Sequence, residues 1–501
     1  MAVARALRDT GRVKRLAALV LVVGCGSEPV VPDLFRCVQL AEPVAFQTDH
    51  DFAPAEPGTL AGWDPNGRWF MIGPKFGPSS VHIARSGNTV TLDRNPAFTG
   101  TIDDSELFGR LEYTNTTGSS VIVATRISNL HDDGRARVER GTCTDGKCTL
   151  CTGELVRATY HFESERVSLG ISLIGQLNDP QWPKTFTFNV RVAGTMAYLI
   201  RRDGLRIIDV SDLSHPVELG SYHRGGEGYP NDVKVVTAGA RTYVVIADTP
   251  VDIVDVTDPR APQLAAQIPL AAHTVFTETR AGATWAYFGG LDGTCPVYDV
   301  TDPALPKLLG SYAAMSALVH DLSVKNGIAY LNAWDGGFQI VDFTDPAMPR
   351  RLGTWAPTPV HTSHSNWTTV IGGRRIALHG EEGYDAKLHV VDVDPASPQF
   401  LRPIGTWATR PWVSIHNIMA FGAKAYMTYY QDGVRVLDVS NPLAPVEIGF
   451  YNTWDPQADY TSSAFYEGAV GLDVDPQTRT IFVADSPRGL LILHDQTPDP
   501  R

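Results

Sequence analysis

One repeated motif limits the folds open to this chain more than any other feature of its sequence. Each copy is an apolar run that ends in an acidic residue, followed by a Ser/Thr-Asp/Asn-Pro-x-x-Pro type of turn and a second apolar run. In six copies the acidic residue, called the marker aspartate below, is Asp209, Asp255, Asp299, Asp342, Asp392 or Asp438. In a seventh, less regular copy, His494 stands in its place. The intervals of 43 to 56 residues fit the four strands of a propeller blade better than ankyrin, TPR or leucine-rich units.

The sixth copy shows how one unit divides into strands. Its apolar segments are 417–421, 424–429, 434–439 and 446–451. Gly422 and the pair Asp432-Gly433 mark hairpin turns between them. In the turn before the last segment, Asp or Asn caps the backbone and proline presets φ. The repeats therefore predict an all-β chain with about seven four-stranded blades.

Two of the repeat cores are Asp252-Ile253-Val254-Asp255-Val256 and Gln339-Ile340-Val341-Asp342-Phe343. With their counterparts, which span roughly 172–495, they resemble the repeats of the LVIVD family of extracellular propellers. The resemblance implies a seven-bladed β-propeller. It implies no single activity, because one fold serves many functions.

Strand counting predicts how the ring closes. The last unit, with segments at 470–474, 480–485 and 490–493, ends before a fourth strand. The segment 172–177 resembles the fourth-strand pattern at 217–222. We therefore expect 172–177 to complete blade seven, so that no sheet edge stays open. The propeller domain is placed at 167–495 and a tail at 496–501.

Residues 34–166 lack the repeat but contain strand-like segments, such as 68–72, 80–84 and 120–124, between Gly-rich and Asn-rich turns. They predict a small β-sandwich or roll. Four cysteines lie in this domain, and the C-x4-C-x2-C spacing of the last three also suits zinc or an iron–sulfur cluster. An even number of cysteines in an oxidising compartment favours two disulfides. The four cysteines are Cys37, Cys143, Cys148 and Cys151. We expect Cys37 to form a disulfide with one of the other three.

The N-terminus is typical of a secreted lipoprotein. A basic stretch is followed by eight apolar residues, 16–23, too few to span a bilayer. Val22-Val23-Gly24-Cys25 resembles a bacterial lipobox, so 1–24 is predicted to be a signal peptide, Cys25 the lipidated residue and 25–33 a tether. Ordinary secretory cleavage is the alternative. Lipidation predicts attachment to a membrane outside the cytoplasm, and Gly26 after the cysteine favours the outer membrane or the cell surface.

Charge excludes one class of partner. The net charge is −13, the leader holds five of the basic residues, and no dense Lys/Arg cluster follows it. An acidic surface repels phosphate backbones, so nucleic acid is not expected as a partner.

The candidate chemistry lies at the start of the innermost strands. No Gly-x-Ser-x-Gly, P-loop or His-Glu-x-x-His motif is present in the sequence. Polar pairs recur instead, and they would converge on one mouth of the channel. They could hold a transition metal or an anion, or they could satisfy backbone groups. The residues are Asn231, Asp232, His273, Thr274, His320, Asp321, His364, Ser365, His416 and Asn417, with His361 and Asn366 nearby.

The remaining polar and aromatic repeats have structural explanations. The marker aspartates are expected to accept hydrogen bonds from the turns that follow them, with calcium binding as the alternative. Cys295 is expected to be a buried thiol on a third strand. Aromatic residues at fourth-strand ends, such as Tyr222 and Trp355, suit packing between blades or a sugar-binding patch.

The sequence therefore favours a monomeric, non-enzymatic scaffold of the cell envelope with a protein or carbohydrate partner. A metal-dependent enzyme using the histidine-lined mouth is the alternative.

Overall fold

A computed structural model describes residues 37–52, 58–73, 79–93, 98–115, 118–159, 167–225, 228–356, 362–456 and 467–500. The leader, Cys25, the tether and His361 lie outside these ranges. Among the described residues, no helix is long and apolar enough to cross a membrane.

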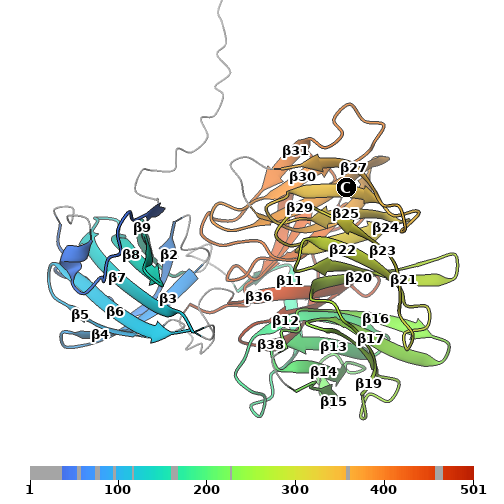
Figure 1. The fold of residues 1–501 in the computed structure, drawn as a ribbon, viewed down its shortest axis with the longest axis horizontal. Coiled ribbons are helices and arrows are strands. Elements are labelled where there is room, and N and C mark those ends of the chain that lie inside the picture. Colours follow the sequence, from blue (N-terminus) through green and yellow to red (C-terminus); the bar gives the residue numbers. More distant parts are fainter. Residues whose placement is uncertain are drawn as a thin grey trace, which may run out of the picture. The chain divides into compact units, whose positions relative to one another are not determined.

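The C-terminal domain is a seven-bladed β-propeller, as the repeats predict (Figure 1). Blades one to three consist of β12 (Thr187–Ala193), β13 (Met196–Arg201), β14 (Gly204–Asp209) and β15 (Val217–Tyr222), then β16 (Asp232–Ala238), β17 (Arg241–Ala247), β18 (Val251–Asp255) and β19 (Gln263–Ile268), then β20 (Ala272–Arg280), β21 (Ala283–Gly290), β22 (Thr294–Asp299) and β23 (Lys307–Ala313). Blades four and five consist of β24 (Asp321–Lys325), β25 (Ile328–Asn332), β26 (Phe338–Asp342) and β27 (Arg350–Trp355), then β28 (Thr362–Ile371), β29 (Arg374–Glu382), β30 (Leu388–Asp392) and β31 (Pro403–Trp407).

Blade six consists of β32 (Ile418–Phe421), β33 (Lys424–Thr428), β34 (Val434–Asp438) and β35 (Val446–Tyr451), and blade seven begins with β36 (Ala469–Asp475), β37 (Thr480–Asp485) and β38 (Gly489–Asp495). The first strand of each blade lies innermost. These seven strands contact one another in turn, and β36 contacts β12, so they form a closed ring. Residues at the start of these strands therefore face a common channel.

The predicted closure of the ring is confirmed. β11 (Ile171–Leu177) pairs antiparallel with β38, with Ser172 opposite His494. One addition was not predicted: β10 (Ser168–Leu169) pairs with β35 as a fifth strand of blade six. A two-residue strand leaves no apolar periodicity to detect. The segment before the first repeat thus extends blade six and completes blade seven.

A glycine in the fourth strand lets neighbouring blades approach. A Cβ atom at Gly220 of β15 would collide with the carbonyl oxygen of Pro259, in the Asp-Pro turn of the next blade. A Cβ atom at Gly175 of β11 would collide in the same way with the carbonyl oxygen of Leu213 in blade one. β11 therefore has the packing role of a fourth strand as well as its hydrogen bonds.

The marker aspartates have the role that the sequence predicts. Asp255 Oδ1 accepts a hydrogen bond of 2.9 Å from the backbone N–H of Thr257. The same bond to the residue two positions on is made by Asp209, Asp299, Asp342, Asp392 and Asp438. These bonds fix the turn between the third and fourth strands.

The N-terminal domain is a closed eight-stranded barrel, β2 to β9. Its strands are β2 (Gly67–Ile72), β3 (Ser79–Ser86), β4 (Thr89–Asp93), β5 (Phe98–Ile102), β6 (Glu106–Thr114), β7 (Ser120–Leu130), β8 (Ala136–Thr144) and β9 (Lys147–Arg157), with β1 (Cys37–Gln39) added beside β9 and a 3-10 turn at Asp49–Asp51. The predicted strand content is present, but the sheet is neither a sandwich nor an open roll. β9 is long enough to pair with β8 along one edge and with β2 along the other, and closure removes the free edges.

Two disulfides join the four cysteines of this domain, as predicted. Cys37 is bonded to Cys151 and Cys143 to Cys148. Each pair lies directly opposite in the strand register, β1 against β9 and β8 against β9. The thiols that a zinc or iron–sulfur site would need are therefore bonded to each other. Cys295 of β22 is a free, fully buried thiol, and burial raises its pKa.

Candidate functional site

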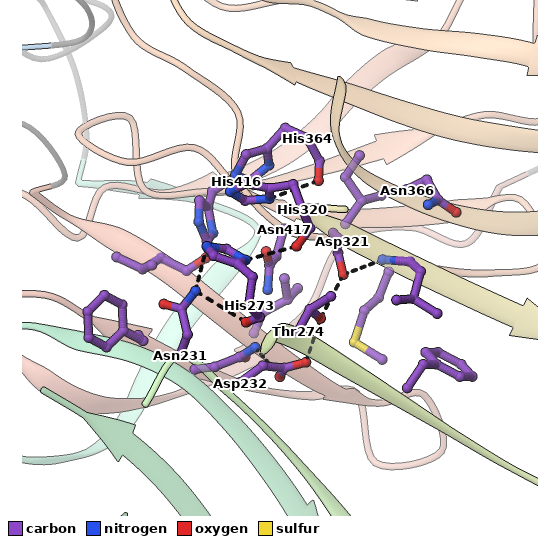
Figure 2. A pocket seen from close by; sticks show the side chains of 18 of the residues that line it. Asn231, Asp232, His273, Thr274, His320, Asp321, His364, Asn366, His416 and Asn417 are labelled. Carbon is purple, nitrogen blue, oxygen red and sulfur yellow. Dashed lines mark hydrogen bonds between the residues drawn. The ribbon is translucent and has the colours of Figure 1, made fainter. Parts of the chain in front are cut away.

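The polar residues predicted at the inner strands line one cavity of about 330 Å³ in the channel. All seven blades contribute to its wall. Figure 2 shows the members that the sequence predicted: Asn231, Asp232, His273, Thr274, His320, Asp321, His364, Asn366, His416 and Asn417. Ser365 is buried beside them, and its hydroxyl donates to the carbonyl oxygen of His416.

The four histidines come from blades three to six and follow one another around the channel. Ring centroids are 4.0 Å apart between His273 and His320, 4.1 Å between His320 and His364, and 4.6 Å between His364 and His416. Nδ1 of His273 lies 2.9 Å from the carbonyl oxygen of His320, and Nδ1 of His416 lies 2.7 Å from that of Val470. Nδ1 of His320 lies 3.3 Å from the carbonyl oxygen of His364. Because a carbonyl only accepts, Nδ1 carries the proton in these three rings and Nε2 has the lone pair.

The second nitrogen distinguishes the rings. Nε2 of His273 lies 2.6 Å from the side-chain amide nitrogen of Asn231, so both nitrogens of this ring are engaged. His364 is the opposite case. It is 1% exposed, and neither of its ring nitrogens makes a hydrogen bond of good geometry with the described residues. A weaker contact with the backbone of His416 acts to raise the pKa of this ring. The cavity thus holds one fully partnered histidine and one whose ring is poorly satisfied.

Burial keeps these imidazoles neutral. It lowers the pKa of His273, and it lowers the pKa of His416 to about 4. The pKa values of His320 and His364 lie well below the ordinary value, because charge on neighbouring imidazoles adds to the effect of burial. At neutral pH the four rings are uncharged, which is the form in which imidazole binds transition metals.

Two residues that the sequence analysis missed complete this side of the cavity. Glu382 ends β29, and its Oε1 lies 3.7 Å from Nε2 of His364. The hydroxyl of Tyr430 donates to the same carboxylate. Burial raises the pKa of Glu382 to about 7, and the bond from Tyr430 opposes that shift. The available signal was the Glu381-Glu382 pair at the end of an apolar second strand, whereas the predicted site residues lie only at the start of first strands.

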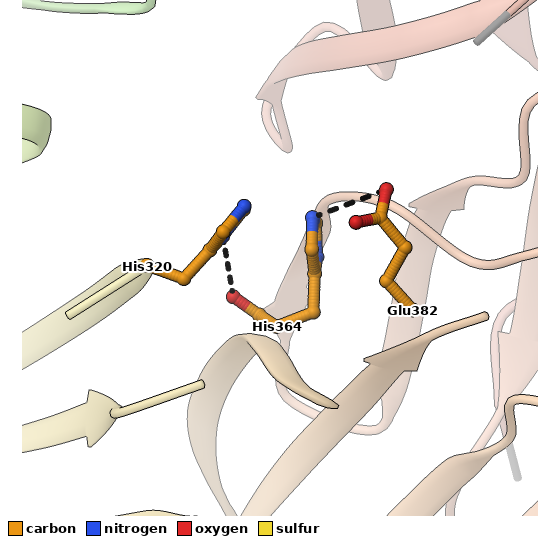
Figure 3. A group of neighbouring side chains, drawn as sticks. All are labelled: His320, His364 and Glu382. Atoms are coloured by element: carbon orange, nitrogen blue, oxygen red, sulfur yellow. Dashed lines mark hydrogen bonds and ion pairs between the residues drawn. The ribbon is translucent and has the colours of Figure 1, made fainter. Parts of the chain in front are cut away.

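One ligand atom from each of His320, His364 and Glu382 lies within 4.8 Å of the others (Figure 3). All three side chains line the cavity. Two imidazoles and a carboxylate are a donor set suited to divalent transition metals.

The opposite side of the cavity holds a carboxylate network. Asp232 accepts hydrogen bonds from Asn189 at 2.7 Å, Thr274 at 2.9 Å and Lys234 at 2.7 Å. The Thr274 hydroxyl also lies 3.2 Å from Asp321. Burial works to raise the pKa of Asp232, but the charges of Lys234 and nearby Arg191 outweigh it, so that pKa is lowered. Burial and the charge of Asp232 raise the pKa of Asp321 to about 7.

Aromatic side chains provide the apolar part of the wall. Phe188 lies 5.2 Å from the ring of Tyr229, and Phe276 lies 6.3 Å from that of Trp367, measured between centroids. All four line the cavity, and Tyr229 is 49% exposed. The cavity is therefore amphipathic, with an aromatic wall beside the polar groups.

A comparison with known repeat families agrees with the propeller fold. The LVIVD repeat model matches residues 187–224, 318–355 and 416–453, which correspond to blades one, four and six. No curated protein matches the chain at a significant level.

Two solved structures that resemble the chain are distant from it in sequence. A computationally designed protein, Ika8, is 11% identical over 64% of this chain and 99% of its own, with a TM-score of 0.43. Raptor of Chaetomium thermophilum is 14% identical over 67% of this chain and 30% of its own, with a TM-score of 0.48. The six four-stranded sheets and the one five-stranded sheet, together with the three matched segments, identify the chain as a seven-bladed β-propeller that contains LVIVD repeats.

Proposed function

We propose that this chain is a lipid-anchored binding protein of the bacterial cell envelope, and that its propeller channel holds a small ligand. The observation that carries the binding role is the cavity of about 330 Å³ walled by all seven blades. Its volume lies at the lower end of the range for small-molecule sites, which are concave and mostly apolar with a few placed polar groups.

The wall indicates the class of ligand. Phe276 and Trp367 suit a planar or apolar group, while Lys234 and Arg191 lie beside the carboxylate network. The ligand is therefore a small amphipathic organic molecule with at least one polar group. A bulky side chain placed in the wall should exclude it.

A matched pair of substitutions on β20 tests this site. Thr277 lines the cavity, whereas Thr279, two residues on, is exposed. Small molecules are screened by thermal shift against the full protein extracted in detergent. Compounds that raise the Tm of wild type and Thr279→Trp but not of Thr277→Trp support the proposal. If no compound shift depends on residue 277, the channel is not the binding site.

The location rests on two features. The lipobox-like sequence ends at Cys25, and the paired cysteines of the barrel suit an oxidising compartment. Mass spectrometry of the mature N-terminus is expected to find a diacylglyceryl group on Cys25. An unmodified Cys25 would overturn the lipoprotein assignment and leave the binding role untouched.

A metal-dependent enzyme is the second candidate, and the cluster of His320, His364 and Glu382 is the observation that favours it. Such an enzyme should hydrolyse ester or phosphoester substrates only when metal is added, and Glu382→Gln should abolish the turnover. Without metal-dependent turnover on such substrates, the binding role stands alone.

A further inference from the structure

We propose that His320, His364 and Glu382 form a binding site for a divalent first-row transition metal ion inside the propeller channel. The site would supply a Lewis-acidic contact for the ligand of the channel. The inference deepens the proposed binding role and, in that respect, rests on it.

The first argument is the poorly satisfied imidazole. His364 is 1% exposed, and its ring nitrogens make no hydrogen bond of good geometry with the described residues, only a weaker contact with the backbone of His416. A buried polar group without a partner costs about 1–3 kcal/mol, and buried polar groups in proteins are nearly always satisfied. Its Nε2 faces Glu382 Oε1 at 3.7 Å, which is too long for a hydrogen bond. A cation bound by His364 Nε2 and the Glu382 carboxylate would satisfy these two groups together, and Nδ1 would keep its contact with the backbone of His416.

The second argument is the convergence of donors from different blades. His320 precedes β24 of blade four, and the other two residues lie on β28 and β29 of blade five. Their ligand atoms lie within 4.8 Å of one another. Around a tetrahedral zinc ion with bonds of about 2.0–2.1 Å, ligand atoms are about 3.3 Å apart. Side-chain adjustments of about an ångström would therefore bring the three donors to one ion.

The third argument is the orientation of the ligands. Metal-binding histidines almost always donate their other N–H to a carbonyl or carboxylate, and ligating carboxylates are themselves hydrogen-bonded. His320 donates from Nδ1 to the carbonyl oxygen of His364, and Glu382 accepts from Tyr430. Two of the three proposed ligands already have the supporting bonds of a metal site.

The neighbouring His273 has a supporting role in this arrangement. Both nitrogens of His273 are engaged, with Asn231 and with the carbonyl oxygen of His320, so this ring supports the segment that carries His320.

Three protein ligands leave at least one coordination position open to the cavity, as in sites where a metal meets a ligand or water. The absence of thiolate in the donor set favours Zn²⁺, Co²⁺, Ni²⁺ or Cu²⁺ over Cu⁺.

Metal titration of the full protein in detergent, after chelation and dialysis, tests the proposal. Co²⁺ is followed by its visible absorption and Zn²⁺ by competition with Co²⁺. We expect one ion per chain in wild type. His320→Ala, His364→Ala and Glu382→Gln should each weaken Co²⁺ binding by about 100-fold or more, and His273→Ala by about 10-fold, the scale of a supporting residue.

His215 provides the matched control. It lies 3.0 Å from Asp212 but is 81% exposed on a turn, so it offers a histidine–carboxylate pair without a buried site. His215→Ala should leave Co²⁺ binding unchanged. Stoichiometric binding that is lost with His215, or kept in Glu382→Gln, would overturn the proposal. Glu382→Gln preserves the shape of the side chain, so it remains informative even where a histidine variant does not fold.

The outcomes separate this proposal from the binding role. If no metal binds while compounds still show a residue-277-dependent thermal shift, the metal site is refuted and the channel ligand is retained. If metal binds but no compound does, the organic ligand is refuted and the metal site stands on its own.

Discussion

Asp232, on the wall formed by blades one to three, accepts hydrogen bonds from Asn189, Lys234 and Thr274. On the wall formed by blades four to six, His364 and Glu382 face each other at 3.7 Å without a hydrogen bond. Both groups of blades bury polar side chains in the same channel. A buried group whose bonds are all made within the protein is explained by the fold, whereas an unsatisfied one that faces a cavity is open to a water, an ion or a ligand.

The strongest test of this comparison is Asp232→Ala. The substitution leaves the Lys234 ammonium and two other donors without their acceptor inside the channel. Removing one partner of a buried ion pair costs about 3–5 kcal/mol. Urea denaturation of the metal-free protein should show a loss of unfolding free energy of that size. A loss below about 1 kcal/mol would mean that the hydrogen bonds to Asp232 do not stabilise the fold.

Asp485 tests what burial does to a carboxyl without a compensating cation in contact. It is fully buried, its Oδ1 accepts from the backbone of Arg488 at 3.1 Å, and burial raises its pKa to about 6. Because the folded-state pKa is raised, its stabilising contribution is present below about pH 4 and is lost as the pH rises through about 6.

Asp485→Asn should therefore gain stability relative to wild type between pH 4 and pH 7, by roughly 3 kcal/mol. Denaturation midpoints across this range measure the effect. Asp232 should behave in the opposite way, since its pKa is lowered and its contribution is lost as the pH falls. A pH-independent difference between Asp485→Asn and wild type would contradict the assignment.

The smallest effect is expected on the histidine side. His364→Leu in chelator replaces a buried ring that makes no hydrogen bond of good geometry with an apolar side chain of similar size. We expect the unfolding free energy to stay within about 1 kcal/mol of wild type, because such replacements are nearly neutral when no partner is lost. Added Zn²⁺ should stabilise wild type only. A loss of several kcal/mol in chelator would show that the fold itself depends on this ring.

The repeat was sufficient to predict the propeller because its determinants are local. The Asp255 bond to Thr257 and the proline turn that follows lie within a few residues of each other, so the sequence displays them in each clear copy. The missing fourth strand of blade seven was predictable by counting, and β11 supplies it. The inner-strand histidines were also identified, since equivalent positions in successive blades must converge on the channel.

Glu382 and Tyr430 were missed for the opposite reason. Neither lies on an innermost strand, and their meeting depends on how blade six packs against blade five. Barrel closure and the pairing of Cys37 with Cys151 depend on β9 pairing along both edges, a relation between residues far apart in the chain. A single sequence does not display such contacts.

The sequence by itself determined the repeat, the number of blades, the strand that closes the ring and the positions that face the channel. These follow from periodicity and turn chemistry, which act over a few residues. Only the tertiary structure decided which polar groups in the channel are satisfied. That outcome depends on distances between side chains of different blades, and those distances are set by packing between the sheets.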